Sequence, residues 1–493
     1  MRRPSRRTRA LGLALALAAL GLPGAVGATP APRVAVAHPA AVPVGDAVVA
    51  TPLTATFDVV LAQPRQRALS EFLAALSDPS SPDYRHFLST RQFARRFGAP
   101  ASSVAAVRGY LAGFGIRTLS LSAGRIELRA RARTTQIARA FATSVATVRT
   151  PEGLAAQFTG PATLPAGVAR LVRAVVGLSS VAPATPVGLA QRPRVATAGT
   201  CPSAGTNSTT PNELGGYTVN QQANLYGLAP LWAKGDTGAG QTIAVYELAP
   251  YSTGDVNTFF SCYSINPSVT NVAVDGGATG KNDLEPTFDV EEAAALAPGA
   301  AIKVYLGPNS GSGPNDVFTQ IADDNTASVV ATSWGDCETD PTNDPSGEQP
   351  IFEQMAAQGQ SVVAAAGDTG SSDCTGITGN APAVDDPASQ PYVTGVGGLT
   401  VSSISPLAQS VWNDGTSAGG GGVSTLWSRP SWQSAPGIAA GATMRMVPDL
   451  SVMADPATGF IDYYTGNASG VCTSGCSQSW SSIGGTSVGP PIV

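Results

Sequence analysis

The chain has 493 residues, of which 43% are hydrophobic and 13% are charged. This composition excludes a disordered protein, and the length predicts two or three domains instead of one core. After roughly the first thirty residues no apolar stretch is long enough to span a bilayer as a helix.

The N-terminal residues have the composition of an export signal. A basic head of five arginines precedes an apolar stretch over residues 11–22 and a small-residue segment over residues 25–28. We therefore predict a signal peptide at residues 1–28 and a secreted, extracellular protein that is not attached to a membrane after signal removal. The Arg6-Arg7 pair leaves the twin-arginine and the general export routes open.

All six cysteines lie after residue 200. An even number in an exported chain predicts disulfides, although six cysteines allow fifteen pairings. Cys472 and Cys476 are near enough in sequence to close a very small loop. The chain has no Cys–His cluster, which argues against a structural zinc site.

Charge divides the chain into a basic and an acidic part. Residues 1–200 contain 24 of the 29 basic and 7 of the 34 acidic side chains, so the remainder has a formal charge of −22. Scattered arginines without lysine argue against nucleic-acid binding. We instead expect a basic N-terminal domain docked on an acidic C-terminal domain. From net charge alone, this contact should loosen when carboxylates protonate at about pH 4.

The basic part is predicted to form a small α+β domain. Residues 55–62 alternate like a strand, and residues 66–76 have the periodicity of an amphipathic helix. A second helix is predicted at 104–114, followed by strands near 116–122 and 125–131 and a helix near 134–142. Residues 180–215 are rich in Pro, Ala, Ser and Thr and are predicted to form a linker.

From residue 240 onward strands alternate with helices. Apolar strands are predicted to end at Glu247, Leu306, Trp334 and Asp368, with helices near 315–325 and 348–358. This order is typical of a parallel sheet with crossover helices. Sites in such sheets gather at the carboxyl ends of the strands, where Glu247, Trp334 and Asp368 are expected.

The histidines limit the possible chemistry. His38 and His86 are the only two, so the part of the chain after the linker cannot form a Ser-His-Asp triad. Any nucleophile there needs a different base. Ser487, in Gly484-Gly485-Thr486-Ser487, is a glycine-flanked serine whose hydroxyl could be exposed at the start of a helix. The same four residues could equally form an ordinary turn.

Glu285 and Asp289 are the candidate base and its partner. Asp283 could cap a helix with Pro286 in its first turn, and the four-residue spacing then puts both carboxylates on one face. Two close carboxylates titrate as a pair, which suits a general base in acid. The alternative is an acidic first turn stabilised by the helix dipole. Glu292 lies on the same face and is a decoy.

Asp368 follows an apolar strand in Ala-Ala-Gly-Asp-Thr-Gly. A carboxylic acid that stays neutral there could donate a hydrogen bond to a developing oxyanion. The alternative is a turn or helix-capping aspartate.

In this order, these motifs resemble the sedolisin family of serine-carboxyl peptidases, especially its kumamolisin-like bacterial members. The resemblance extends over nearly the whole chain from about residue 50. The segments that carry it are Gly485-Thr486-Ser487-Val488-Gly489-Pro490, Glu285 with Asp289, Gly367-Asp368-Thr369-Gly370, Ser333-Trp334-Gly335 and, in the front part, Ser77-Asp78-Pro79 and Pro82-Asp83-Tyr84.

The resemblance implies a subtilisin-like α/β catalytic domain preceded by a ferredoxin-like propeptide domain. By the same resemblance Ser487 is the nucleophile, Glu285 the general base, Asp289 the acid that orients it, and Asp368 the oxyanion stabiliser. Glu247 and Trp334 correspond to positions that extend the carboxylate network.

The corresponding domain boundaries are a signal peptide at 1–28, an activation propeptide at 29–185, a linker with the maturation site at 186–215 and a peptidase domain at 216–493. The expected partners are peptide substrates and the chain's own propeptide as an intramolecular inhibitor. We expect a monomer that binds no nucleic acid.

The sequence departs from the family after Ser487. The family's calcium site lies well beyond its serine, whereas this sequence ends at Val493, so the calcium ligands are expected to be absent and the catalytic domain incomplete. The alternative function is therefore a truncated, inactive homologue or a binding module. A subtilisin-type protease is rejected because no histidine follows residue 86.

Overall fold

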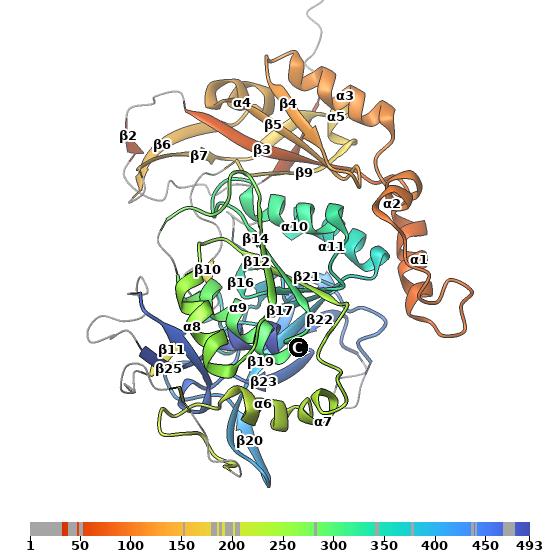
Figure 1. Cartoon of the computed structure of the whole chain (residues 1–493). Helices are drawn as coiled ribbons and strands as arrows, with labels where there is room; N and C mark the ends of the chain where they lie inside the picture. The colour runs from red at the N-terminus through yellow and green to blue at the C-terminus, as the bar shows by residue number, and fades with distance from the viewer. Residues whose placement is uncertain are drawn as a thin grey trace, which may run out of the picture. The chain divides into compact units, whose positions relative to one another are not determined.

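The N-terminal part of the chain contains a four-stranded antiparallel sheet with helices on one face (Figure 1). The computed structural model describes residues 32–37, 47–48, 53–150, 153–178, 185–186, 190–192, 201–202, 208–280, 283–340, 345–375, 379–434, 438, 441–466 and 479–493. The predicted signal peptide lies outside these residues, as do His38, Cys472 and Cys476.

The elements of the N-terminal part follow the predicted order. They are β1 (Arg33–Ala37), β2 (Ala47–Val48), β3 (Thr54–Leu61), α1 (Gln66–Ser77), α2 (Thr90–Arg96), α3 (Ala101–Ala112), β4 (Arg117–Leu121), β5 (Glu127–Arg133), α4 (Thr134–Phe141), β6 (Ser144–Thr150), β7 (Gly153–Thr159), β8 (Ala162–Pro165), α5 (Ala166–Ala169) and β9 (Val172–Val176). The helix predicted at 104–114 begins three residues earlier, at Ala101.

The main sheet of this part has the order β4-β5-β3-β9, and all three strand pairs are antiparallel. With α3 after β3 and α4 after β5, this is the βαββαβ arrangement of a ferredoxin-like fold, as predicted. Phe57, Val59 and Leu61 alternate towards the core under the helices. Asp58 and Val60 therefore point to the opposite face of the sheet.

The C-terminal part is built on an eight-stranded sheet. Its first elements are α6 (Val219–Leu225), α7 (Ala229–Trp232), β12 (Thr242–Glu247), α8 (Thr253–Tyr263), β13 (Ser268–Ala273), α9 (Leu284–Leu296), β14 (Ala301–Leu306), α10 (Gly313–Asp324), β15 (Val329–Thr332), β16 (Trp334–Cys337), α11 (Pro345–Gln358) and β17 (Ser361–Ala365).

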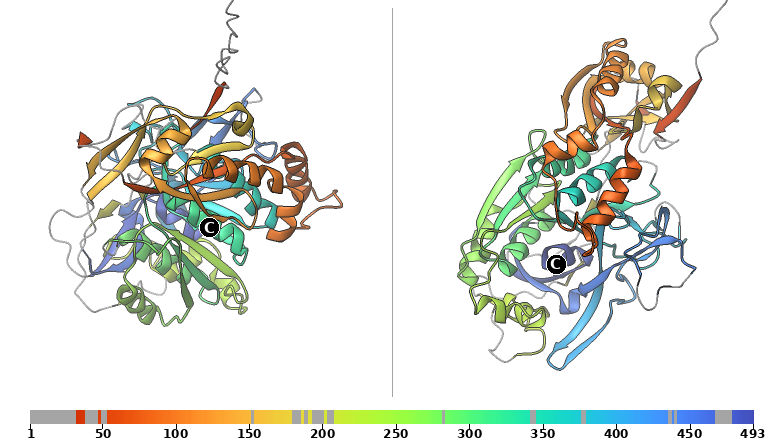
Figure 2. Two further views of the ribbon diagram at one scale, coloured as in Figure 1. Left: turned by 90° about the horizontal axis from the view of Figure 1, so that it is seen from above. Right: turned by 90° about the vertical axis from the view of Figure 1, so that its right-hand side faces the viewer.

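The later elements complete this sheet and add smaller ones. They are β18 (Asp385–Asp386), β19 (Val393–Ile404), β20 (Leu407–Val411), β21 (Gly422–Ser428), β22 (Met444–Val447), β23 (Leu450–Met453), β24 (Phe460–Tyr464), β25 (Ser479–Gly484) and α13 (Gly489–Ile492). The short α13 packs against α9 and the central strands, and it directly precedes the C-terminus that is marked in both views of Figure 2.

The sheet runs in the order β13-β14-β12-β15-β17-β19-β20, with β23 also paired to β19. The strands are parallel except β20. Ala244 and Tyr246 pack towards α10 and α11, whereas Val245 packs towards α8 and α9. The sheet therefore carries helices on both faces, which confirms the predicted α/β class.

Two predicted strand ends were wrong, and one of them, at Asp368, lies three residues beyond the observed end of β17. The parallel strand β15 stops at Thr332, and Trp334 begins the separate strand β16, which pairs antiparallel with β18. Ser333 is the bend between the two strands, so its side chain is buried beside the carboxyl edge of the sheet. The unbroken apolar run Val-Val-Ala-Thr gave no signal of this break.

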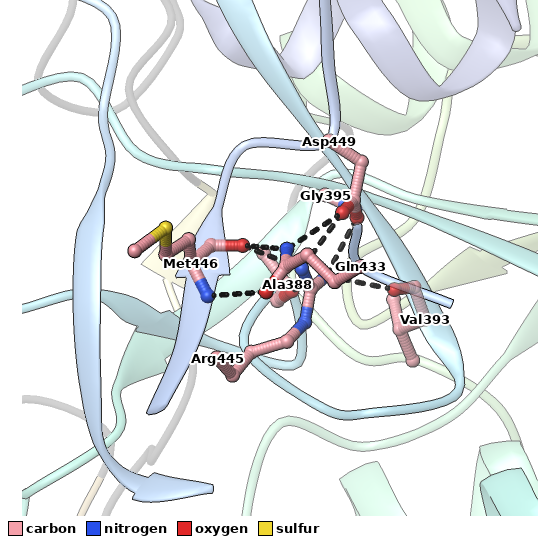
Figure 3. A network of polar contacts seen from close by, with 7 residues as sticks. All are labelled: Ala388, Val393, Gly395, Gln433, Arg445, Met446 and Asp449. Carbon is pink, nitrogen blue, oxygen red and sulfur yellow. Dashed lines mark hydrogen bonds and ion pairs between the residues drawn. The ribbon is translucent and has the colours of Figure 1, made fainter. Parts of the chain in front are cut away.

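A buried arginine joins the start of β19 and the residues just before it to the segment that leads into β23. Arg445, which is fully buried, donates to Asp449 at 2.7 and 2.6 Å and to the carbonyl oxygens of Ala388 and Val393 (Figure 3). Asp449 also accepts the Gly395 N–H at 2.9 Å. Both terminal nitrogens of Arg445 and both oxygens of Asp449 are therefore paired, whereas Arg445 Nε is buried without a partner.

Two disulfides lie within the described residues, joining Cys201 to Cys262 and Cys337 to Cys374. No helix in the described part of the chain is both long and apolar enough to cross a membrane.

Candidate active site

Helix α9 brings the two predicted carboxylates together. Its N-cap is Asp283, whose side chain accepts the Leu284 N–H at 2.6 Å, as predicted. Glu285 and Asp289 lie one turn apart and both are fully buried. The helix is buried along its whole length, so these carboxylates face protein and not water.

Ser487 lies against Glu285. Burial and then the charge of Asp289 raise the pKa of Glu285 well above its ordinary value, whereas hydrogen bonding to the Ser487 and Ser333 hydroxyls opposes the rise. The contact is loose, because neither Glu285 oxygen has a partner at full hydrogen-bonding geometry. Loose contacts of this kind are common in enzymes without bound substrate.

Ser333 links the carboxylates to the serine segment. Its hydroxyl oxygen lies 3.0 Å from Asp289 Oδ1 and 3.0 Å from the carbonyl oxygen of Ser487. From the sequence, Ser333 was identified only as part of a motif. The signal that could have assigned its role is its position between an apolar strand and Trp334, where a parallel sheet places its functional side chains.

Glu247 and Trp334 extend the network behind Asp289. The Trp334 indole Nε1–H donates to Glu247 Oε2 at 2.9 Å, and both side chains are buried. Burial raises the pKa of Asp289 to about 7, and hydrogen bonding with Glu247 lowers it. The same interaction raises the pKa of Glu247, after burial and the charge of Asp289. These directions favour a proton on Glu247 over one on Asp289, while neither Glu247 Oε1 nor Asp289 Oδ2 has a partner at full hydrogen-bonding geometry.

Asp368 lies three residues after the end of β17 and contacts Thr486. Its Oδ1 accepts the Thr486 N–H at 2.7 Å and the Thr486 hydroxyl at 2.9 Å, while Oδ2 is buried without a partner. Burial raises the pKa of Asp368 well above its ordinary value, and the hydrogen bonds from Thr486 oppose this. A neutral Asp368 could therefore donate through Oδ2 to an oxygen beside Ser487.

The residue before Asp368 has to be glycine. Gly367 has a φ of 108°, and a Cβ there would lie 2.3 Å from the Asp373 carboxyl carbon. The Gly367 N–H donates to the Thr486 hydroxyl oxygen at 3.0 Å. Thr486 thus joins the Asp368 turn to the Ser487 segment, a role that no sequence pattern predicted.

Glu292, the predicted decoy, is also fully buried. Neither of its oxygens has a partner, and burial followed by the charge of Asp289 raises its pKa well above the ordinary value. Its neighbours include Tyr226, whose pKa is raised by burial and, to a smaller extent, by the charge of Glu292. The described contacts do not connect Glu292 to Ser487.

Two short strands from the predicted linker pair with the site. β10 (Thr185–Pro186) is antiparallel to β16, with Pro186 opposite Trp334, and β11 (Ala190–Arg192) is antiparallel to β25, with Ala190 opposite Gly484. Both partners adjoin the site, since Trp334 follows Ser333 and Gly484 precedes Ser487 by three residues. The backbone beside Ser487 thus accepts extended peptide on two edges, a common mode of peptide recognition.

The family's calcium ion is not supported by the residues present. Among the described residues no group of three or more His, Cys, Asp or Glu side chains has an arrangement that could hold a metal ion.

Comparisons with known proteins agree with these observations. Residues 44–181 match the family model described as "Pro-kumamolisin, activation domain". The chain is 33% identical to kumamolisin of Bacillus sp. (strain MN-32) over 408 residues, which cover 77% of this chain and 70% of that protein. It is 28% identical to sedolisin of Pseudomonas sp. (strain 101) over 454 residues, covering 86% and 72%.

A solved structure of Pseudomonas sedolisin, described as a serine-carboxyl proteinase complexed with two molecules of pseudo-iodotyrostatin, is 26% identical. The match covers 58% of this chain and 79% of that one, with a TM-score of 0.48. At 33% identity over more than two thirds of kumamolisin, and with the activation domain matched separately, the chain belongs to the sedolisin family of serine-carboxyl peptidases.

Proposed function

We propose that this protein is a secreted endopeptidase that acts in acid and is made as a zymogen that cleaves its own linker. Ser487 attacks the scissile carbonyl, Glu285 accepts the serine proton, Asp289 orients Glu285, and Asp368 stabilises the tetrahedral intermediate. The observation that carries the proposal is the buried contact of Ser487 with Glu285, made in a domain without histidine.

A glutamate can serve as the base in acid because the carboxyls titrate together. The charge of Asp289 is one cause of the raised pKa of Glu285. A proton held between Asp289 and Glu247 would remove that charge and so lower the pKa of Glu285, which allows Glu285 to ionise at a lower pH. Trp334 supports this arrangement by donating to Glu247 at 2.9 Å.

The substrate would pair with the same two strands as the linker, β16 and β25. The strands β10 and β11 belong to one continuous chain and pair on either side of the Ser487 segment. We therefore narrow the maturation site from the whole linker to the bonds between Pro186 and Ala190. The matched activation domain supports its role as an intramolecular inhibitor before that cleavage.

The test is an acid shift of the purified precursor from neutral pH to about pH 4, where ordinary carboxyls titrate. Propeptide loss and peptide hydrolysis are followed in the parent and in Ser487→Ala, Glu285→Gln and Glu292→Gln. We expect the first two variants to lose both activities by about a thousandfold or more, because each removes a reacting group.

The Glu292→Gln variant is the matched control, since it removes a buried carboxyl from the same face of α9. It should retain most of the activity, and the new N-terminus of the mature protein should lie between residues 187 and 190. Processing by Ser487→Ala or Glu285→Gln would overturn the site assignment. If the parent also shows neither propeptide loss nor peptide hydrolysis, the result would favour the alternative, an inactive homologue.

A further inference from the structure

The Cys337–Cys374 disulfide joins two segments that adjoin the candidate active site. Cys337 is the last residue of β16, three residues after Trp334, and this strand pairs with the linker strand β10. Cys374 follows Asp368, the proposed oxyanion stabiliser, by six residues. Both cysteines are buried. The disulfide therefore connects the strand that pairs with extended peptide to the turn that carries the proposed oxyanion donor.

Asp373, which precedes Cys374 in the chain, contacts both residues that flank Asp368. Its Oδ1 accepts the Thr369 N–H at 2.8 Å and the Thr369 hydroxyl at 2.8 Å. Its carboxyl group also lies against Gly367, where a Cβ would be 2.3 Å from the carboxyl carbon. An asparagine would keep the Oδ1 acceptor, so these contacts do not need the charge of Asp373. The position of Asp368 thus depends on where Asp373 and the bridged Cys374 lie.

Two other segments hold the near side of the same turn. Thr486 donates its N–H and its hydroxyl to Asp368 Oδ1, at 2.7 and 2.9 Å. Residues 418–421 pair with the turn backbone, since the Ala418 N–H donates to the Asp368 carbonyl oxygen at 2.9 Å and the Gly421 N–H to that of Gly370 at 3.0 Å. Both sets of contacts restrain the turn between residues 367 and 370, and the disulfide restrains it at residue 374.

The far side of the turn also contacts the segment that leads into β18. The Ala383 N–H donates to the Ser371 carbonyl oxygen at 3.0 Å, and Ala383 packs against the two bridged cysteines. A hydrogen bond of this kind contributes about 1 kcal/mol, whereas a covalent bridge fixes the separation of the two segments that it joins. The disulfide is therefore the stronger restraint on this side.

We propose that Cys337 and Cys374 are positioning residues, whose disulfide holds Asp368 where its Oδ2 can reach the carbonyl oxygen of a peptide bound along β16. This inference rests on the proposed function, in which Asp368 stabilises the tetrahedral intermediate. The disulfide does no chemistry in the reaction and acts through Asp373 and the turn. Such restraint matters because an oxyanion donor must already point at the oxygen on which charge develops, and a misplacement of about 1 Å can lower a rate by about 100-fold.

The same restraint keeps Asp368 away from water. Burial is the largest cause of its raised pKa, and the raised pKa keeps the carboxyl neutral and able to donate. A turn released from β16 would admit water, which would return the pKa of Asp368 towards its ordinary value. The neutral donor would then be lost at a lower pH, so the decline of kcat towards neutral pH should also begin at a lower pH.

The Cys201–Cys262 disulfide provides a matched control. Its cysteines are 61 residues apart in sequence, against 37 for Cys337 and Cys374. The entropy of loop closure varies slowly with loop length, so removal of either disulfide should lower stability by a similar amount. Cys262 lies in α8, which contributes none of the proposed catalytic residues. Alanine replaces each cysteine, because it leaves no buried hydroxyl without a partner.

Peptide hydrolysis at about pH 4 is measured for the parent, Cys337→Ala/Cys374→Ala and Cys201→Ala/Cys262→Ala. We expect the first pair of substitutions to lower kcat by about 10- to 100-fold with KM within about threefold of the parent, and the second pair to leave both unchanged. In a chain that carries Asp368→Ala, removal of the Cys337–Cys374 disulfide should lower kcat by less than about threefold, because the group that it positions is absent.

Hydrogen exchange measured by mass spectrometry tests the restraint without using activity. In chains that carry Ser487→Ala, we expect residues 366–375 to exchange at least about tenfold faster without the Cys337–Cys374 disulfide and at the parent rate without Cys201–Cys262, with β12 as the internal reference. If Cys337→Ala/Cys374→Ala fails to fold, the folded Cys201→Ala/Cys262→Ala chain is measured before and after reduction with tris(2-carboxyethyl)phosphine, and alkylation shows that Cys337 and Cys374 have opened.

Three results would overturn the proposal. Exchange of residues 366–375 could be the same with and without the Cys337–Cys374 disulfide. Removal of either disulfide could lower kcat equally, as a general loss of stability requires. Removal of Cys337–Cys374 could lower kcat by the same factor in the Asp368→Ala chain as in the parent. A parent without hydrolysis would instead contradict the proposed function, and the exchange rates would then show separately whether the disulfide holds the turn.

Discussion

Burial without a cationic partner is shared by the carboxyl groups of the candidate site. Glu247, Glu285, Asp289 and Asp368 are each at most 9% exposed, and desolvation is the largest cause of every raised pKa among them. Close carboxyls in such a setting share protons, so they do not all carry a full negative charge at the same time. This allows one residue to remain basic while another remains a neutral hydrogen-bond donor.

The protonation state of Asp368 should control part of the pH dependence of kcat. The proposed donor is the neutral acid, which exists below the raised pKa and is lost as the pH rises through it. Asn at this position donates an N–H that does not titrate. We expect Asp368→Asn to lower kcat at pH 4 by about 10- to 100-fold, and to reduce the decline of kcat towards neutral pH.

The measurement is the pH profile of kcat for parent and variant. Asp373→Asn is the matched control, since Asp373 lies beside Gly367, has a pKa raised by burial to about 6 and accepts the Thr369 N–H. The idea fails if Asp368→Asn keeps the descending limb of the parent, because a group other than Asp368 would then control it.

At the scale of the element, the first turn of α9 sets the position of the base. Asp283 caps the helix at 2.6 Å from the Leu284 nitrogen and also holds the Thr287 hydroxyl through its carbonyl oxygen at 2.7 Å. Glu285 lies within this turn, so a frayed N-terminus would move it away from Ser487. The cap has a stabilising and a positioning effect that can be separated.

We expect Asp283→Ala to lower the free energy of unfolding by about 1 kcal/mol and kcat by about tenfold. Ser252→Ala is the control, because Ser252 caps the neighbouring helix α8 through the Asp255 N–H at 3.2 Å. It should cost similar stability and leave kcat unchanged. Unfolding is measured by urea titration and kcat by peptide hydrolysis. Equal kcat values in the two variants would show that the cap does not position Glu285.

At the scale of the whole molecule, a few buried polar side chains connect segments far apart in sequence. Arg445 joins Ala388, Val393 and Asp449 in this way, with no exposed surface of its own. Removing it would leave Asp449 without its cation and the carbonyl oxygens of Ala388 and Val393 without their donor. Such a loss is much larger than that of an exposed ion pair.

Arg445→Met, made in the Ser487→Ala chain to prevent self-digestion, should lower the free energy of unfolding by about 3–5 kcal/mol. Arg67→Met is the control, since the Arg67–Glu71 pair is largely exposed on α1 and should leave stability unchanged. Urea unfolding measures both. A loss below about 1 kcal/mol for Arg445→Met would contradict the role assigned to the network.

Much of the local structure could be predicted because it depends on neighbouring residues. The spacing of Glu285 and Asp289 behind Asp283 was sufficient for a capped helix with both carboxylates on one face. The alternation of β3 and the run that ends at Glu247 predicted two strands within one residue of their observed bounds. The absence of histidine after residue 86 excluded a Ser-His-Asp triad on residue identity alone.

Contacts between distant residues depended on the order of strands and the packing of helices. Ser487 meets Glu285 and Ser333 across more than 150 residues, because η2 (Thr486–Val488) and α9 meet beside the carboxyl ends of the central strands. The break at Ser333 and the pairing of Cys201 with Cys262 had no local signal.

By itself, the sequence determined the elements, the family resemblance and the candidate residues, because motif spacing and periodicity are properties of short segments. Only the tertiary structure decided which carboxyls are buried together and which of them have cations. Net charge alone predicts that the basic N-terminal part and the acidic C-terminal part attract each other as opposite charges. Burial raises the pKa of Asp58 and Glu127 at this contact, since desolvation depends on surroundings that no local pattern contains.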